Sequence, residues 1–160
     1  ATPFIASIDV DDPVFSSMGK MPRKIEQQCK ASGQSIPSSK NETIRTALEG
    51  LALKYRQVLE NLRSQTGKSL EQIHIVGGGT KNELLNQMTA DSTGCEIIAG
   101  PIEATSVGNI LVQMIATGEI SSLTEGRQLV RESFEPKRYQ PHHSEQWEEA
   151  YQTMRSLNQV

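Results

Sequence analysis

The amino-acid sequence predicts an α/β fold in which short parallel strands are flanked by helices. Three observations support it: a long helical pattern over residues 41–66, an apolar run at 73–76 that stops at three glycines, and further helical segments around a second apolar run at 95–99. Helices that alternate with short apolar strands are typical of a layered fold with parallel strands. We divide the chain into an irregular segment with a short helix (1–40), an α/β core (41–141) and a C-terminal amphipathic helix (142–160).

Composition and charge exclude several classes of protein. The chain has 160 residues, enough for one domain with a hydrophobic core, and a formal net charge of -3. Mild acidity argues against nucleic-acid binding, which needs many Lys and Arg residues to neutralise phosphates. No apolar run approaches the roughly 20 residues that span a bilayer, and the chain does not open on a secretory signal. We therefore expect a cytoplasmic protein with no nucleic-acid or membrane partner.

The residue types that bind metals show no ligand pattern. Cys29 and Cys95 lie far apart and neither belongs to a CxxC pair, so we expect two reduced, partly buried thiols. His74 lies within an apolar run and is expected on a strand, while His142 and His143 match no zinc spacing. The sequence therefore predicts no metal ligand.

The N-terminal third should contain two helices after an irregular start. A short helix is expected after Pro22, with Ile25 and Cys29 on its inner face and Gly33 as its stop. The long helix is capped by Ser39 or Asn41 and ended by Gly67. Apolar residues at spacings of three and four define its inner face: Ile44, Ala47, Leu48, Leu51, Ala52, Tyr55, Val58, Leu59 and Leu62.

After the long helix, the spacing of apolar residues changes from the helical repeat to a short continuous run that is typical of a strand. Residues 73–76 are expected to form a buried strand that ends in the glycine loop, and a helix follows from about Lys81 to Gly94. Its expected inner face is Leu84, Leu85 and Met88. Residues 95–99 are expected to form a second strand, closed by Gly100-Pro101.

The remaining elements are mainly helical. One helix is expected from Glu103 to Thr117 and a second from Glu125 to Ser133, capped by Thr124. Residues 134–141 should be extended, and Ser144 can cap the last helix. The inward side chains of the first helix are expected to be Val107, Ile110, Leu111, Met114 and Ile115, and the last helix contains Trp147, Tyr151, Met154 and Leu157.

The loop of Gly77, Gly78 and Gly79 is the candidate binding site. Consecutive glycines let the backbone approach a ligand closely, and a helix start offers unpaired N–H groups and a positive dipole end. Together they predict a phosphate or nucleotide site, and the alternative is a tight turn without a ligand. A P-loop would continue with Gly-Lys-Ser/Thr, and a Rossmann fingerprint would place glycine at Asn82, so neither applies.

Two longer motifs resemble those of a known family. Residues 73–94, IHIVGGGTKNELLNQMTADSTG, resemble the adenosine motif of the actin and sugar-kinase superfamily. Residues 100–108, GPIEATSVG, which open the motif at 100–118, resemble the second connecting helix of the FGGY carbohydrate kinases. Residues 9–34, together with SFEPKRYQP near the end, resemble the rhamnulokinase branch of that family. The resemblance extends from about residue 8 to about residue 141.

This resemblance implies roles for individual residues. The fold would be a partial ribonuclease-H-like C-terminal domain of the actin/hexokinase superfamily. Gly77, Gly78 and Gly79 would lie against the phosphates and ribose of ATP or ADP, with Mg²⁺ accompanying the nucleotide. Asn82 would lie at the adenine end, where it either contacts the base or caps the helix. Gly108 would be a close-packing position near the interdomain hinge.

The resemblance also implies missing parts. The family uses an aspartate to accept the proton of the sugar hydroxyl, but none of the four aspartates, Asp9, Asp11, Asp12 and Asp91, has its context. We therefore assign no catalytic residue. We expect a piece of a longer enzyme that is inactive alone, with the sugar bound mainly outside this chain. The antiparallel strands that open the family's sheet would precede Ala1, so we expect self-association through an exposed sheet edge.

The implied activity is phosphorylation of L-rhamnulose to L-rhamnulose 1-phosphate by ATP. Three alternatives stay open: another FGGY kinase that acts on a ketose or polyol, a non-catalytic nucleotide-binding module, and a helical interaction domain without a ligand.

Overall fold

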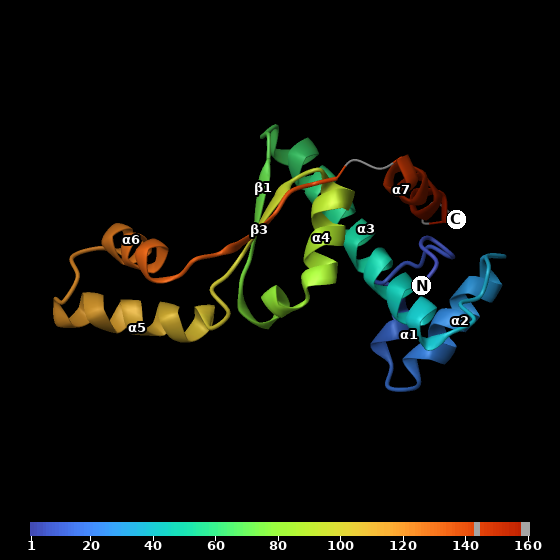
Figure 1. Ribbon diagram of the computed structural model, residues 1–160, viewed down its shortest axis with the longest axis horizontal. Helices are drawn as coiled ribbons and strands as arrows, with labels where there is room; N and C mark the ends of the chain where they lie inside the picture. Colours follow the sequence, from blue (N-terminus) through green and yellow to red (C-terminus); the bar gives the residue numbers. More distant parts are fainter. Residues whose placement is uncertain (143–144, 158–160) are drawn as a thin grey trace.

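The computed structural model in Figure 1 describes residues 1–142 and 145–157. Three helices come first, α1 (Pro13–Ser16), α2 (Met21–Ala31) and α3 (Lys40–Thr66). The central layer then runs through β1 (Gln72–Ile75), the 3-10 helix η1 (Gly77–Lys81), α4 (Glu83–Thr93) and β2 (Glu96–Ala99). The chain continues with α5 (Ala104–Thr117), α6 (Leu123–Ser133), β3 (Lys137–Tyr139) and α7 (Glu145–Leu157).

The sheet has the strand order β1-β2-β3. β1 and β2 are parallel, with His74 opposite Ile98, which confirms the predicted parallel pair. β3 is antiparallel to β2 and pairs Arg138 with Ile98. β3 was expected only as an extended segment, because its three residues carry no strand-like pattern. β1 is not the buried strand that was predicted, since its residues are half-buried or exposed.

One face of the sheet is covered by helices. α4 packs on it, and Ala90 forms a buried cluster there with Ile97, Ala99 and Tyr139. α3 packs against α4, and the two helices are side by side in Figure 1. A second cluster joins α3, α4 and α7 through Leu53, Met88, Trp147, Tyr151 and Met154, among others. Because side chains alternate along a strand, Ile98 and Arg138, which are not members of that cluster, face the opposite side of the sheet.

The irregular N-terminal segment packs on α3. Ala6 and Ile8 form a buried cluster with Ile25 and Cys29 of α2, which confirms the predicted inner face of that helix. A side chain cannot fit at Gly50 of α3, because a Cβ atom there would lie 2.8 Å from Ile8 Cγ1. Gly50 therefore lets the extended segment lie directly against the helix.

The buried face of α3 agrees with the predicted one only in part, since Ala52 and Leu59 are buried as expected. Thr46, Glu49, Gly50 and Leu53 are buried, whereas four residues of the predicted stripe remain 42–48% exposed: Ile44, Tyr55, Val58 and Leu62. The physical reason is that the N-terminal segment and α7 occupy this side, so small and polar positions on α3 make the close contacts.

Most helix ends follow the predicted signals. Ser39 caps α3 by accepting a hydrogen bond from the Glu42 amide, and Gly67 ends it in the left-handed conformation. Gly94 and Gly118 end α4 and α5 in the same way. Two helix starts differ from the predictions. α4 begins at Glu83, because η1 occupies the residues before it, and Ser122 caps α6 in place of Thr124. The predicted cap at residue 144 lies outside the described residues.

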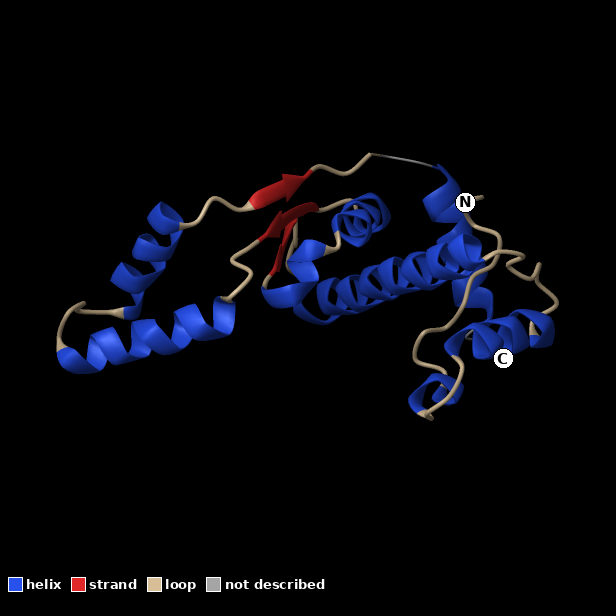
Figure 2. Cartoon of the chain, turned by 60° about the horizontal axis from the view of Figure 1, so that its bottom comes forward, coloured by secondary structure: helices blue, strands red, loops and turns tan. Residues whose placement is uncertain are grey.

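α5 and α6 form a hairpin that extends away from the rest of the chain (Figures 1 and 2). Of the inward residues predicted for α5, only Leu111 is buried, and Ile110 is 56% exposed. Val107, Met114 and Ile115 are half-buried, so the predicted face is confirmed only in part, because the main packing partner of α5 among the described residues is α6. No helix among the described residues is long and apolar enough to cross a membrane.

Candidate nucleotide-binding turn

The three glycines form the turn that joins β1 to α4. Gly77 has a φ of 78°, which places it in the left-handed region that favours glycine. Its N–H donates to the carbonyl of Pro101 at 3.1 Å. The Thr80 hydroxyl donates back to the Gly77 carbonyl at 2.7 Å, and the Asn82 N–H donates to the Gly79 carbonyl at 3.1 Å. The turn is therefore held by two hydrogen bonds of its own and by one to Pro101.

Gly78 presents bare backbone to its surroundings. A Cβ atom added there would meet nothing within 4 Å, while one at Gly79 would lie 3.7 Å from Ile75 Cγ2. Both glycines are exposed. The space beside Gly78 is thus free for an incoming group, and no neighbouring protein atom accounts for the glycine.

Asn82 caps α4. Its Oδ1 accepts a hydrogen bond from the Leu85 N–H at 3.1 Å, which satisfies one of the unpaired amides of the first turn. Of the two roles considered for this residue, the structure shows the cap. The side chain is exposed at the same end of the helix as the glycine turn.

Asn86 is a supporting residue that sequence reasoning did not single out. It is 1% exposed, and its Nδ2 donates to the Thr80 carbonyl at 3.0 Å. This bond ties the second turn of α4 to the glycine turn. The predicted inner face of this helix, Leu84, Leu85 and Met88, did not include Asn86, and Leu84 is in fact 51% exposed, so the spacing of apolar residues offered no signal for this residue.

The second motif meets the turn only through its first residues. Pro101 accepts the Gly77 hydrogen bond, and α5 then leads away from the sheet. Among the described residues nothing packs closely on Gly108, because a Cβ atom there would meet nothing within 4 Å. The glycine that permits close packing in the hairpin is Gly126, whose added Cβ would lie 3.3 Å from side-chain atoms of both Leu111 and Ile120.

The four aspartates have structural partners. Asp9 and Asp12 accept backbone N–H groups in the N-terminal segment at 3.0 and 2.8 Å. Asp11 lies 2.7 Å from the Lys54 ammonium, and Asp91 on α4 accepts the His142 N–H at 2.8 Å. Among the residues that the structure describes, no three His, Cys, Asp or Glu side chains form a group that could hold a metal ion.

An apolar groove adjoins the turn. It has a volume of about 640 Å³ and lies between α3, β1 and α4, with Gly79 and Asn86 in its lining. We call it the α3–β1 groove. Its apolar lining comes mainly from Tyr55, Val58, Leu59, Leu62, Leu70, Ile73, Ile75 and Leu85.

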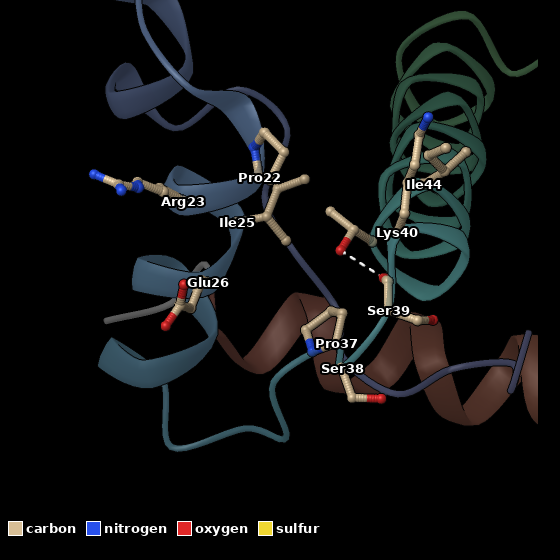
Figure 3. Close-up of a pocket in the computed structure, with 10 residues that line it drawn as sticks. Pro22, Arg23, Ile25, Glu26, Pro37, Ser38, Ser39, Lys40 and Ile44 are labelled. Atoms are coloured by element: carbon tan, nitrogen blue, oxygen red, sulfur yellow. Dashed lines mark hydrogen bonds between the residues drawn. The ribbon is translucent and has the colours of Figure 1, made fainter.

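A separate cavity of about 370 Å³ lies far along the chain from the turn, between α2 and the start of α3. Figure 3 shows Pro22 and Ile25 facing the first residues of α3, whereas Arg23 extends away. The dashed line there is the hydrogen bond from the Thr43 hydroxyl to the Ser39 carbonyl, at 2.9 Å. This bond lies within the first turn of α3, whose start is capped separately by the hydrogen bond from the Glu42 N–H to the Ser39 hydroxyl at 3.2 Å.

Comparison with known proteins identifies relatives of this chain. Residues 2–117 match the C-terminal domain model of the FGGY family of carbohydrate kinases. A rhamnulokinase of Bacteroides thetaiotaomicron is 40% identical over 149 residues, which cover 93% of this chain and 31% of the relative. The chain thus spans less than a third of that protein's length.

Solved structures share the fold. Gluconate kinase from Lactobacillus acidophilus superposes with a TM-score of 0.61 at 19% identity, covering 76% of this chain and 24% of that one. Plasmodium falciparum glycerol kinase with ADP superposes with a TM-score of 0.57 at 22% identity, covering 74% of this chain and 23% of that one. These likenesses confirm the predicted α/β fold class and show that the chain shares its fold with part of each of these kinases.

Proposed function

The chain belongs to the FGGY family of carbohydrate kinases, as its C-terminal domain, and from this premise we propose that it forms the nucleotide-binding part of a kinase that phosphorylates L-rhamnulose. The single observation that carries the proposal is the glycine turn. Its Gly78 backbone is exposed beside open space in the short 3-10 helix η1, which leads into the capped start of α4, and helix starts favour phosphate groups. The proposed ligand is ATP or ADP.

The turn residues would bind and orient the nucleotide. The backbone of Gly77, Gly78 and Gly79 would lie against the phosphates and ribose, and Asn82 would contribute from the adenine end. Mg²⁺ would be held by the nucleotide's phosphates and water, since magnesium uses few protein ligands beside a phosphate. Phosphoryl transfer depends mainly on such positioning and on charge stabilisation.

The base and the sugar pocket are proposed to lie outside this chain. All four aspartates are engaged in structural contacts, so none is placed to accept a proton from a sugar hydroxyl at the turn. We therefore expect this chain alone, mixed with ATP and L-rhamnulose, to show no turnover. The proposed cytoplasmic location is supported by the buried, unpaired thiols of Cys29 and Cys95.

The choice of sugar rests on sequence likeness. Kinases named for gluconate and glycerol share the fold at 19% and 22% identity, so the fold does not select a substrate. The rhamnulokinase relative is 40% identical over nearly the whole chain, which favours L-rhamnulose over another ketose or polyol. A substrate panel on a longer protein that contains this chain tests this choice.

The nucleotide site can be tested by titrating this chain with ADP and following backbone amide signals by NMR. We expect shifts centred on residues 77–85 that disappear in Gly78→Val, because the new side chain would fill the open space. Gly108→Val is the matched control, since its Cβ also meets nothing, and it should bind as the wild type does. Equal shifts in Gly78→Val and wild type would contradict the proposed site.

A further inference from the structure

A second pocket lies on the sheet face that α4 leaves uncovered. It has a volume of about 690 Å³ and lies between the ends of β1 and β2 and helix α6. His74, Ile98 and Arg138, which are aligned across the three strands, line one side. The carboxyl ends of parallel strands are a common position for ligands in α/β folds.

The charged groups of this pocket are cationic. Arg127 and Arg131 lie four residues apart on α6, and Arg138 joins them from β3. Arg138 lies 3.1 Å from Glu96, but within residues 1–142 and 145–157 no carboxylate lies within ion-pair distance of Arg127 or Arg131. Like charges at this helical spacing repel each other. An anion bound between them would remove that repulsion.

The rest of the lining is apolar. Val76 and Phe134 are 55% and 41% exposed, whereas Ile98, which also lines the pocket, is only 6% exposed. Guanidinium groups bind phosphate through paired hydrogen bonds, while an apolar floor with an exposed aromatic ring suits a flat organic group. We propose that this pocket binds a small phosphorylated molecule, with its phosphate on Arg127 and Arg131 and its apolar part on Val76 and Phe134.

The pocket adjoins the glycine turn through Val76, which directly precedes Gly77, and through Pro101. Pro101 lines the pocket and also accepts the Gly77 hydrogen bond. A ligand in the pocket would therefore pack against the loop that holds the turn. The inference does not depend on what the turn itself binds.

Phenyl phosphate and inorganic phosphate are suitable probes, and binding is followed by amide NMR on this chain. We expect phenyl phosphate to shift the signals of Val76, Ile98 and residues 127–138, and to bind more tightly than inorganic phosphate. Arg127→Gln/Arg131→Gln should weaken both by roughly tenfold or more, as expected for lost charge-assisted hydrogen bonds. Phe134→Ala should weaken only phenyl phosphate.

The control must remove the same charge elsewhere. Arg23→Gln/Lys40→Gln changes two cations that line the other cavity, and it should leave both affinities within about twofold, since distant exposed charges are screened by salt. Equal weakening in the two double variants, or no shifts at residues 127–138, would overturn the inference. Phenyl phosphate binding should persist in Gly78→Val, so failure here and failure of the nucleotide site remain distinguishable.

Discussion

Glu49 is a buried carboxylate that ties the N-terminal segment to α3. It is 1% exposed, accepts the Phe4 N–H at 3.0 Å and lies 2.7 Å from Arg45 Nε. Burial raises the pKa of the carboxyl, and the Arg45 and Phe4 hydrogen bonds oppose that rise only in part. The neutral acid is therefore favoured in the folded chain relative to the unfolded one.

The raised pKa of Glu49 determines how the stability of the fold depends on pH. A raised pKa stabilises the fold below the unfolded value of 4.5, and the contribution is lost as pH rises through the folded value. We compare the free energy of unfolding of the wild type with that of Glu49→Gln. The difference, wild type minus variant, should fall between the unfolded and the folded pKa of Glu49, by about 1.4 kcal/mol per unit of pKa difference. Urea unfolding across a pH series measures it.

Glu42→Gln is the control for this experiment. Hydrogen bonds from Ser38 lower the pKa of the half-buried Glu42 carboxyl. Its contribution to stability is therefore present above the unfolded pKa and is lost as pH falls through the folded one. The two difference curves should therefore slope in opposite directions. Parallel curves would show that burial does not control Glu49.

At the scale of elements, the glycine turn and α4 act together because of Asn86. Replacing this residue by leucine leaves the Thr80 carbonyl without its donor, and we expect a loss of about 1–3 kcal/mol in unfolding free energy. The amide hydrogens of Gly77 and Asn82 should exchange faster, and ADP should bind more weakly. Hydrogen exchange and the ADP titration provide the measurements.

Thr89→Val separates this effect from general damage to α4. The Thr89 hydroxyl donates to the Leu85 carbonyl within the same helix at 2.7 Å, so its loss should lower stability without speeding exchange at Gly77. If exchange at the turn rises equally in both variants, Asn86 has no specific role in holding it.

Helix ends were predictable from sequence because their causes are local. Ser39, Gly67 and Gly94 act on backbone groups a few residues away, and the glycine turn likewise follows from its own residues. The buried face of α3 depends on contacts with Ile8, which is distant in sequence. The role of Asn86 depends on the turn's exact shape. Neither could be inferred from spacing alone.

For the molecule as a whole, the sheet is the part that sequence reasoning described least completely. β3 becomes a strand only through pairing with β2, and its sequence, Lys-Arg-Tyr, has no apolar period. The predicted edge is present, since among the described residues β1 pairs with β2 alone. That edge adjoins the α3–β1 groove, so unpaired backbone groups and exposed apolar side chains lie together.

We propose that this edge and groove make the chain self-associate, because unpaired edges and apolar patches both favour contact with another chain. Val58→Lys should shift the population toward monomer, since it places a charge in the groove. Ile44→Lys is the matched control. Ile44 lies on the same helix and is 48% exposed, against 46% for Val58, but its side chain lies outside the α3–β1 groove. Lysine favours helix at both positions. Sedimentation velocity over a range of concentrations measures the result, and a wild type that stays monomeric throughout, or two variants that behave alike, would refute association through this surface.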